Sequence, residues 1–315
     1  MIDQYGRNIT YLRLSVTERC QLRCTYCRAA EGCCPRAAEL SADEFTRITR
    51  LFVSLGINKV RLTGGEPLLR KDILQIVENI ASMEGIKDIS MTTNAQMLPG
   101  KALALRQAGL KRLNISLDSL NPQTFQEMTG GKLEPVLQGI SEAIEAGLLP
   151  VKVNCVVVKG KNEHEIDDFI ALTENRPIDV RFIELMPIGE NDYEHIDKVS
   201  NQDLLDARPY LKPVQDRYHG QPSRDYQVDG HMGRVGFISS ISHKFCADCN
   251  RIRLMSDGML RPCLGNELEI PLKAALKEGD DVLLEILKNA IYFKPIGHHF
   301  ESCSYTHRDM SRIGG

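Results

Sequence analysis

Six of the ten cysteines in this chain form two groups of three whose spacing is typical of metal ligands. The first group is Cys20, Cys24 and Cys27, a C-x3-C-x2-C pattern directly after an apolar run. Cysteine thiolates at short spacings on a loop hold iron–sulfur clusters. Three ligands leave one iron of a four-iron cluster open, and an open iron binds a small molecule and passes an electron into it. Structural zinc prefers four ligands, so zinc is the weaker interpretation of this triad.

The second group is Cys246 and Cys249, followed after thirteen residues by Cys263. This spacing also predicts a metal site, either a second iron–sulfur cluster or half of a zinc ribbon. A zinc ribbon needs a fourth ligand, for which the sequence offers three candidates: Cys303, His243 and His298.

The four other cysteines do not share this pattern. Cys155 lies within an apolar run, where a free thiol packs as a small hydrophobic side chain. Cys33 and Cys34 are adjacent, and adjacent thiols rarely bind one cluster together, so we interpret them as loop thiols. Cys303 stays open between a tail thiol and a ligand. The pattern as a whole indicates a reducing compartment, hence a cytoplasmic protein.

Composition narrows the function further. The net charge is −3, so no overall field favours nucleic acid or a membrane surface, and an anionic substrate needs local arginines and lysines. We expect no signal peptide, because no basic stretch followed by an apolar run stands at the N-terminus. No apolar run approaches the length of a membrane span, so we expect no transmembrane helix.

The elements that must position these cysteines alternate along the first two thirds of the chain. Ser41 to Glu44 form a capping box that predicts a helix start, and Asn121-Pro122 predicts another. Six strand-like runs with helical patterns between them favour a parallel sheet, as a barrel or an open sheet. These runs are Ile9–Val16, Lys59–Thr63, Ile89–Thr93, Arg112–Leu117, Val151–Val158 and Asp179–Leu185.

The pattern changes after about residue 200. Short strands are expected at Val235–Ser239 and Arg251–Met255, and helices at Glu267–Lys277 and Asp281–Ala290. We therefore expect two regions, residues 1–195 and a smaller region of residues 196–315.

Residues that could bind a ligand or take part in catalysis follow the expected strands. Because ligands gather at the carboxyl ends of parallel strands, these residues should meet at one edge of the sheet. In chain order they are Cys20, Gly64-Gly65, Asn94, Asp118, Ser119 and Met186.

These motifs carry a resemblance to a known family. The first triad with Tyr26, followed by Gly64-Gly65-Glu66-Pro67, resembles the radical S-adenosylmethionine (SAM) superfamily. The second triad with the embedded Cys249-Asn-Arg251-Ile-Arg253 resembles the molybdenum cofactor biosynthesis protein A family, the GTP 3′,8-cyclases. Further matching segments are Arg13-Leu-Ser-Val-Thr-Glu-Arg-Cys20, Arg61-Leu-Thr-Gly-Gly-Glu-Pro67, Thr92-Thr93-Asn94, Asn114-Ile-Ser116-Leu-Asp118, Arg181-Phe-Ile-Glu-Leu-Met186 and Gly314-Gly315. The chain departs from the family at Arg28-Ala-Ala, where Met-Pro is usual.

The resemblance implies a partial (β/α)6 TIM-type barrel with a smaller C-terminal region that carries a second cluster. It implies two [4Fe–4S] clusters, the first on Cys20, Cys24 and Cys27 and the second on Cys246, Cys249 and Cys263. The implied SAM contacts are Tyr26, Gly65, Ser116 and Met186. The implied GTP contacts are Arg13, Arg61, Thr92, Lys152, Arg181, Arg251 and Arg253. The resemblance also implies that the Gly314-Gly315 tail reaches into the active site as catalytic support.

The residues agree with part of this assignment. A triphosphate needs arginine forks and a lysine point charge. Arg251 and Arg253 stand two apart on an expected strand, so their side chains share one face.

The implied reaction converts GTP to (8S)-3′,8-cyclo-7,8-dihydroguanosine 5′-triphosphate, the first step of molybdenum cofactor synthesis. A 5′-deoxyadenosyl radical takes hydrogen from ribose C3′, and the resulting carbon radical attacks guanine C8. The implied partners are a downstream cyclic pyranopterin monophosphate synthase and an electron donor such as flavodoxin or ferredoxin. We expect neither nucleic acid nor membrane as a partner, and a homodimer stays open.

Two alternatives remain at this point. One is a radical SAM enzyme that modifies a peptide with the help of an auxiliary cluster. Such relatives usually carry more cysteines in the C-terminal region, where this chain has only Cys303 beyond the second triad. The other is a non-catalytic zinc or iron–sulfur module, which metal analysis distinguishes from the enzyme.

Overall fold

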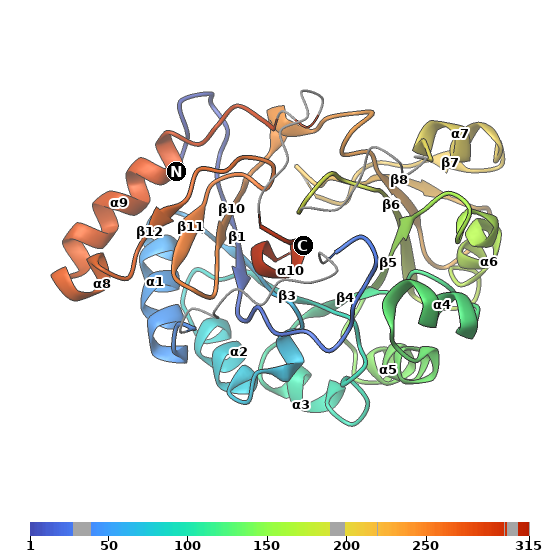
Figure 1. Ribbon diagram of the computed structural model, residues 1–315, viewed down its shortest axis with the longest axis horizontal. Helices are drawn as coiled ribbons and strands as arrows, with labels where there is room; N and C mark the ends of the chain where they lie inside the picture. Colours follow the sequence, from blue (N-terminus) through green and yellow to red (C-terminus); the bar gives the residue numbers. More distant parts are fainter. Residues whose placement is uncertain (28–38, 190–198, 219, 299, 301–307, 315) are drawn as a thin grey trace.

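Twelve strands of the described chain form one sheet whose middle is parallel and whose two ends are antiparallel. The computed structural model describes residues 1–27, 39–189, 199–218, 220–298, 300 and 308–314. The strand order is β12-β11-β10-β1-β2-β3-β4-β5-β6-β9-β8-β7. Figure 1 shows this sheet curved around a central space with helices on its outside, which is the arrangement of a partial barrel.

The six expected strands are confirmed as the core of the parallel part, with ends that differ by at most two residues. Their bounds are β1 Tyr11–Ser15, β2 Lys59–Thr63, β3 Asp88–Thr93, β4 Arg112–Ser116, β5 Val151–Val157 and β6 Ile178–Glu184. Apolar residues of each strand point outward to the helices, and Leu12, Leu14, Val60 and Leu62 are fully buried there. This burial is the main force that holds helices and sheet together.

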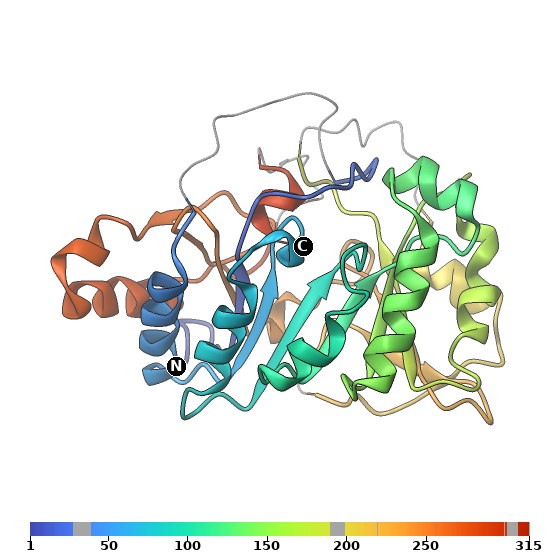
Figure 2. The ribbon, with the colours of Figure 1, turned by 90° about the horizontal axis from the view of Figure 1, so that it is seen from below.

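The helices between these strands cover the outer face of the sheet (Figure 2). They are α1 Ala42–Ser54, α2 Ile73–Ala81, α3 Ala102–Gln107, α4 Pro122–Thr129, α5 Leu133–Glu145 and α6 Ile166–Ala171. Both expected helix starts are confirmed. Ser41 and Glu44 form the complete capping box of α1, and the Asn121 side chain accepts hydrogen bonds at the start of α4. Phe45, Ile48 and Phe52 of α1 are fully buried against the sheet.

The C-terminal part of the chain extends the same sheet at both ends. Strand β9 (Val235–Ile238) pairs in parallel with β6, and β10 (Arg251–Leu254) pairs in parallel with β1. The antiparallel additions are β7 Lys212–Pro213, β8 Arg224–Gln227, β11 Met259–Arg261 and β12 Ile270–Pro271. The expected boundary between residues 195 and 196 lies outside the described residues, so the two-region division stays a prediction.

One expected helix is wrong. Residues 267–274 are not helical; they include β12, and only α8 (Ala275–Glu278) lies in the expected range. Pro271 explains this, because proline inside a helix removes a hydrogen bond and clashes with the preceding turn. The other expected helix is confirmed as α9 (Asp280–Tyr292).

The last described residues lie near the carboxyl end of β1. A short helix, α10 (Met310–Ile313), lies there, and the hydroxyl of Ser15 at the end of β1 donates to the carbonyl of Arg312, 3.4 Å away. Within the described residues, no helix combines the length and apolar character that crossing a membrane requires.

Candidate active site

Both cysteine triads line one cavity of about 300 Å³ at the carboxyl ends of the parallel strands. Residues at the ends of β1, β2, β3, β4 and β6 meet there as the sequence predicts: Cys20, Gly64, Gly65, Asn94, Asp118 and Met186. Ser119 is the exception: it does not line the cavity, and its buried hydroxyl donates to Glu165, 2.6 Å away.

The first triad is held by a close approach of two loops. The loop after β2 donates hydrogen bonds from the Gly65 and Glu66 amides to the Thr17 and Arg19 carbonyls, each at 2.7 Å. A Cβ atom on Gly65 would stand 2.4 Å from the Arg19 oxygen. Only glycine allows this approach, and the approach fixes the backbone one residue before Cys20.

Glu66 connects this loop to β3. Its buried carboxylate accepts hydrogen bonds from the Thr93 hydroxyl and the Asn94 amide, both at 2.7 Å. Burial raises the pKa of Glu66 to about 7, although these hydrogen bonds oppose the rise. The Asn94 side-chain amide in turn lies 3.6 Å from the Cys20 sulfur. A sulfur-directed donor of this kind stabilises a thiolate.

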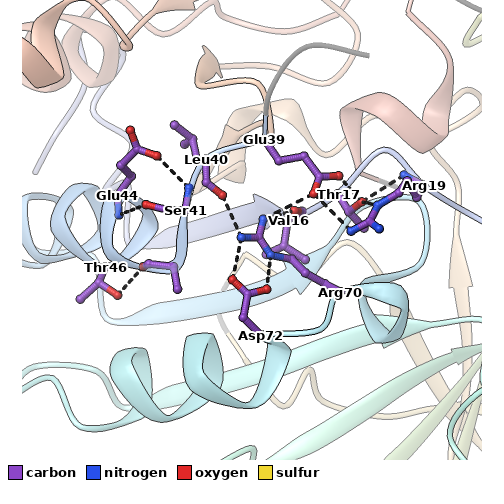
Figure 3. A network of polar contacts seen from close by, with 11 residues as sticks. Val16, Thr17, Arg19, Glu39, Leu40, Ser41, Glu44, Thr46, Arg70 and Asp72 are labelled. Carbon is purple, nitrogen blue, oxygen red and sulfur yellow. Dashed lines mark hydrogen bonds and ion pairs between the residues drawn. The ribbon is translucent and has the colours of Figure 1, made fainter. Parts of the chain in front are cut away.

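A buried arginine, Arg70, holds the segment after β1 that leads to Cys20 (Figure 3). The Arg70 guanidinium donates to the carbonyls of Val16 and Leu40 and binds the Asp72 carboxylate. Nearby, the Thr17 hydroxyl donates to Glu39, which also pairs with Arg19. The loop that carries Cys20 therefore leaves β1 in one fixed direction.

Tyr26 and Asp118 both line the cavity and are joined by a hydrogen bond. The Tyr26 hydroxyl donates to the Asp118 carboxylate at 2.7 Å, and the Val156 amide donates to the other oxygen at 2.9 Å. Burial raises the pKa of Asp118 to about 6. Burial also raises the pKa of the Cys24 thiol well above its usual value, and the charge of Asp118 adds to this effect. Two further implied SAM contacts, Ser116 and Met186, line the same cavity.

The second triad enters the cavity from the C-terminal part. Cys246 begins a short turn in which the Cys249 amide donates to its carbonyl at 3.2 Å, and Cys263 follows β11. Burial by itself would raise the pKa of Cys249, but Arg251 and Lys294 outweigh it and lower that pKa to about 6. Cys249 is thus prepared to act as a thiolate.

Arginines dominate the charge between the two triads. Five of them line the cavity with Lys294, and among the described lining residues Asp118 is the one carboxylate: Arg13, Arg61, Arg181, Arg251 and Arg253. Burial and mutual repulsion lower the pKa of Arg253 to about 10, and burial with repulsion from Arg61 does the same for Arg181. Positive charges this crowded and this poorly solvated favour a polyanionic ligand.

Unused polar atoms point to the same conclusion. Within the described part of the chain, Thr92 Oγ1, both side-chain polar atoms of Asn114, Asn154 Oδ1 and Arg253 Nε are buried without a hydrogen-bond partner. All four residues line the cavity. Buried polar groups are nearly always paired, so these atoms await a ligand with many donors and acceptors.

Lys152 is the one implied GTP contact that does not line the main cavity. It lines a second cavity of about 60 Å³ at the amino-terminal side, which shares Arg13, Arg61, Arg181 and Arg251 with the main one. Burial lowers the pKa of Lys152 to about 6, against the opposing charge of Asp179 at 3.8 Å. The two cavities adjoin, and the basic side chains that line them, Lys152 included, are here called the basic column.

Sequence reasoning missed several residues of this column. Lys59, Arg112 and Tyr218 line the smaller cavity, and the Tyr218 ring lies within 4.7 to 5.6 Å of the charges of Lys59, Arg112 and Lys152. Lys59 and Arg112 stand two positions before Arg61 and Asn114, so the two-residue period of a strand was a usable signal. No local pattern marks Tyr218 or Lys294.

The C-terminal tail reaches the edge of the site. Met310 and Ser311 line the main cavity, and a Cβ on Gly314 would stand 2.2 Å from the Thr63 hydroxyl oxygen. Gly314 has a φ of +81°, a conformation that glycine adopts without strain. Gly315 lies outside the described residues, as do Cys33, Cys34 and Cys303. Cys155 is fully buried in the core, as expected.

The donor set fits iron–sulfur clusters. All six triad cysteines are free thiols that are partly open to the cavity. Across the described residues, no three His, Cys, Asp or Glu side chains converge on the position of a single metal ion. A four-iron cluster distributes three thiolates over three different irons, so it suits wider triads than one zinc ion does.

The chain matches two described families. Residues 14–173 match the Radical SAM superfamily, and residues 178–300 match Molybdenum Cofactor Synthesis C. The chain is 48% identical to the GTP 3′,8-cyclase of Alkaliphilus oremlandii over 321 residues, with 100% of both chains covered. It is 44% identical to the GTP 3′,8-cyclase of Geobacter sulfurreducens over 325 residues, covering 100% of this chain and 99% of the relative.

Solved structures share the fold at low identity. Streptococcus suis SuiB bound to S-adenosylmethionine superposes with a TM-score of 0.62 at 18% identity, over 92% of this chain and 67% of SuiB. Methylornithine synthase superposes with a TM-score of 0.50 at 18% identity, over 62% of this chain and 59% of the synthase. These likenesses confirm the expected barrel fold and carry no statement about substrate.

Proposed function

The chain belongs to the GTP 3′,8-cyclases of the radical SAM superfamily, and we propose that its two cysteine triads each hold a [4Fe–4S] cluster on either side of one GTP. Its activity is the radical SAM step of molybdenum cofactor biosynthesis. The observation that carries the proposal is that both triads and five arginines line a single cavity. A peptide-modifying activity has no comparable support. SuiB has also been solved with a precursor peptide, but at 17% identity its likeness to this chain is one of fold alone.

Cys20, Cys24 and Cys27 hold the first cluster, and Tyr26, Gly65, Ser116 and Met186 contact SAM. The support is their common position at the ends of β1, β2, β4 and β6 around one part of the cavity. Gly65 leaves its backbone accessible there, and the Tyr26–Asp118 hydrogen bond fixes the aromatic ring.

Cys246, Cys249 and Cys263 hold the second cluster, beside the strand that carries Arg251 and Arg253. These arginines, with Arg13, Arg61, Arg181 and Lys152, bind the triphosphate through charge-assisted hydrogen bonds. Thr92 supplies a neutral hydroxyl whose oxygen has no partner within the described residues. The five arginines line the same cavity as the second triad, so the phosphates and the guanine can be held there together. Lys152 lines the adjoining smaller cavity, and the negative charge of a bound triphosphate would raise its lowered pKa and favour its charged form.

When bound, the clusters and SAM supply an electron, a carbon-centred radical and a binding site for the base. The chain supplies position and shelter. The arginines hold the nucleotide so that its ribose stays close to SAM, which is worth several orders of magnitude in rate. Met310 and Ser311 of helix α10 line the cavity, and Gly314 packs against Ser15 and Thr63 beside it.

The test compares one variant in each triad. Cys24→Ala should abolish 5′-deoxyadenosine formation, because the radical source loses a ligand. Cys263→Ala should retain some 5′-deoxyadenosine formation and lose the cyclised nucleotide. Cys155→Ala is the matched control, since that thiol is fully buried in the core and does not line the cavity that the two triads share. Iron analysis of all four proteins, with reconstituted chains and GTP under anaerobic conditions, completes the experiment.

Iron content decides between the proposal and a metal-binding module. About eight irons per chain are expected in the unsubstituted protein and about four in either triad variant. Zinc in place of iron, or a normal rate of 5′-deoxyadenosine formation by Cys24→Ala, would contradict the assignment.

The partners and the location follow from the same activity. The product requires an enzyme that converts it to cyclic pyranopterin monophosphate, and the first cluster requires a reductant such as flavodoxin or ferredoxin. Free thiols in both triads are consistent with a cytoplasmic protein.

A further inference from the structure

A lysine is buried beside the second triad, and no carboxylate of the described residues pairs with it. Lys294, just after α9, is 1% exposed and lines the main cavity. Its ammonium donates to the Pro262 carbonyl at 2.7 Å, one residue before Cys263. Taking an ammonium out of water is costly unless an anion or several hydrogen bonds compensate.

The neighbours of Lys294 that can carry a negative charge are the side chains of Cys249 and Cys263, once they are thiolates. Burial lowers the pKa of Lys294, while Cys249 and Cys263 raise it and Arg7 and Arg251 lower it. In the part of the chain that the structure describes, no acidic side chain forms an ion pair with Lys294. The charge of this lysine is therefore balanced only if the two cysteines are thiolates, as they are when they bind iron.

The backbone at Lys294 is itself clamped. The Arg7 guanidinium donates to the carbonyls of Lys294, Pro295 and Ile296 at 3.2, 2.7 and 2.9 Å, and to that of Cys246 at 3.1 Å. Asp3 holds the same guanidinium at 2.6 Å in a buried ion pair. A side chain anchored at both ends keeps its charge at a fixed place beside Cys249 and Cys263.

We propose that Lys294 is a positioning residue whose fixed positive charge raises the reduction potential of the second cluster. This inference rests on the proposed function, because it requires a cluster on Cys246, Cys249 and Cys263. Reduction adds one electron and hence one negative charge to the cluster. A nearby buried cation stabilises the reduced form more than the oxidised form, since charge and burial set cluster potentials.

The experiment is a redox titration of the reconstituted full chain, followed by electron paramagnetic resonance. A Cys24→Ala background removes the first cluster, so the signal belongs to the second. Lys294→Met keeps the length of the side chain and removes its charge. We expect at least a tenfold loss in the equilibrium constant for reduction, which is 59 mV toward more negative potential for one electron. Lys294→Arg should retain the original potential. Lys288→Met is the control, because Lys288 lies on the exposed side of α9.

The outcomes separate this inference from the proposed function. If the Cys24→Ala chain holds no iron, the second cluster is absent and the proposed function is wrong. If iron is bound and Lys294→Met leaves the potential within threefold of the original equilibrium constant, Lys294 has no electrostatic role. Lys294→Gln keeps an N–H donor for the Pro262 carbonyl and removes the charge. A negative shift of the potential in Lys294→Gln as large as that in Lys294→Met supports the proposal, because the charge is what both variants lack. The original potential in Lys294→Gln, with a shift in Lys294→Met alone, would overturn it in favour of a purely structural hydrogen bond to Pro262.

Discussion

Single side chains in the cavity have ionisation states that burial controls. Asp118 is the clearest case, because burial raises its pKa from 3.8 to about 6 while two hydrogen bonds hold its carboxylate in place. Over the interval between these values the folded chain keeps a proton that the unfolded chain has released. The contribution of Asp118 to the free energy of unfolding therefore falls as pH rises through this interval and is constant above it.

Asp118→Asn should remove that pH dependence. An asparagine still accepts from the Val156 amide and donates to the Tyr26 oxygen, so the packing is preserved. Between about pH 4.5 and about pH 7.5, the cluster-free parent should lose about 2 kcal/mol more stability than the variant. Urea unfolding at both pH values measures this, and an identical pH dependence of the two proteins would refute the role of Asp118.

Arg253 tests the basic column at the same scale. Hydrogen bonds to charged groups are worth roughly 1.5–3 kcal/mol each, so Arg253→Ala should weaken GTP binding about tenfold to a hundredfold. SAM affinity should stay the same, because Arg253 lies on the strand next to the second triad. Arg50→Ala on the exposed face of α1 is the control. Calorimetric titration gives both affinities. An unchanged GTP affinity would show that Arg253 does not bind GTP.

Whole elements bring these side chains together, and the contact between the β1 and β2 loops matters most. The Cβ of an alanine at Gly65 would stand 2.4 Å from the Arg19 oxygen, and backbone does not yield easily. Gly65→Ala should displace the Cys20 loop, lowering iron at the first triad and SAM affinity while the second triad keeps its iron.

A second glycine serves as the control for that prediction. Gly100 also has a positive φ, +77°, but no atom lies within 4 Å of an added Cβ. Gly100→Ala should lower thermal stability modestly and leave iron and SAM binding intact. Comparable loss of SAM binding in both variants would mean that the close approach at Gly65 is not what positions the loop.

At the scale of elements, local sequence patterns predict well where helices and strands occur, and predict poorly which strands pair with each other. The capping box at Ser41 and the strand Lys59–Thr63 are confirmed because they depend on residues within one turn or one strand. The helix expected through Pro271 is wrong because pairing with β11 outweighs a weak helical period. The pairing of β10 with β1 has no local signal, since about 240 positions separate them in the chain.

The same reasoning explains what the sequence reveals of the site. The triads and the strand-end residues follow from spacing and from the rule that ligands gather at carboxyl ends. The basic column is only half visible, because Tyr218 and Lys294 enter it from loops of the C-terminal part. Side chains that reach the site through tertiary packing leave no periodic trace in the sequence.

The molecule as a whole is closed by its own C-terminus. The tail is docked by ion pairs of Arg308 with Asp257 at 2.7 Å and Glu269 at 2.8 Å, and of Arg312 with Glu18 at 3.3 Å. These ion pairs precede Gly314 in the chain and do not involve it. Gly314 rests against Ser15 and Thr63 at the ends of β1 and β2.

Deletion of Gly314 and Gly315 should therefore separate catalysis from stability. Iron content, thermal stability and SAM affinity should stay nearly intact, because the ion pairs of Arg308 and Arg312 remain. Formation of the cyclised nucleotide should fall sharply, with 5′-deoxyadenosine falling in step if the tail helps to capture the radical. Product analysis by mass spectrometry measures both, and full activity of the shortened chain would show that the tail is only a loose end.

The pairing of β10 with β1 has a consequence for biosynthesis of the protein. A ribosome adds roughly 5–20 residues per second, so β1 waits many seconds for its neighbour to emerge. During that time the nascent sheet has an open margin, and such margins promote aggregation. Recombinant yield should thus depend on slow expression and on chaperones.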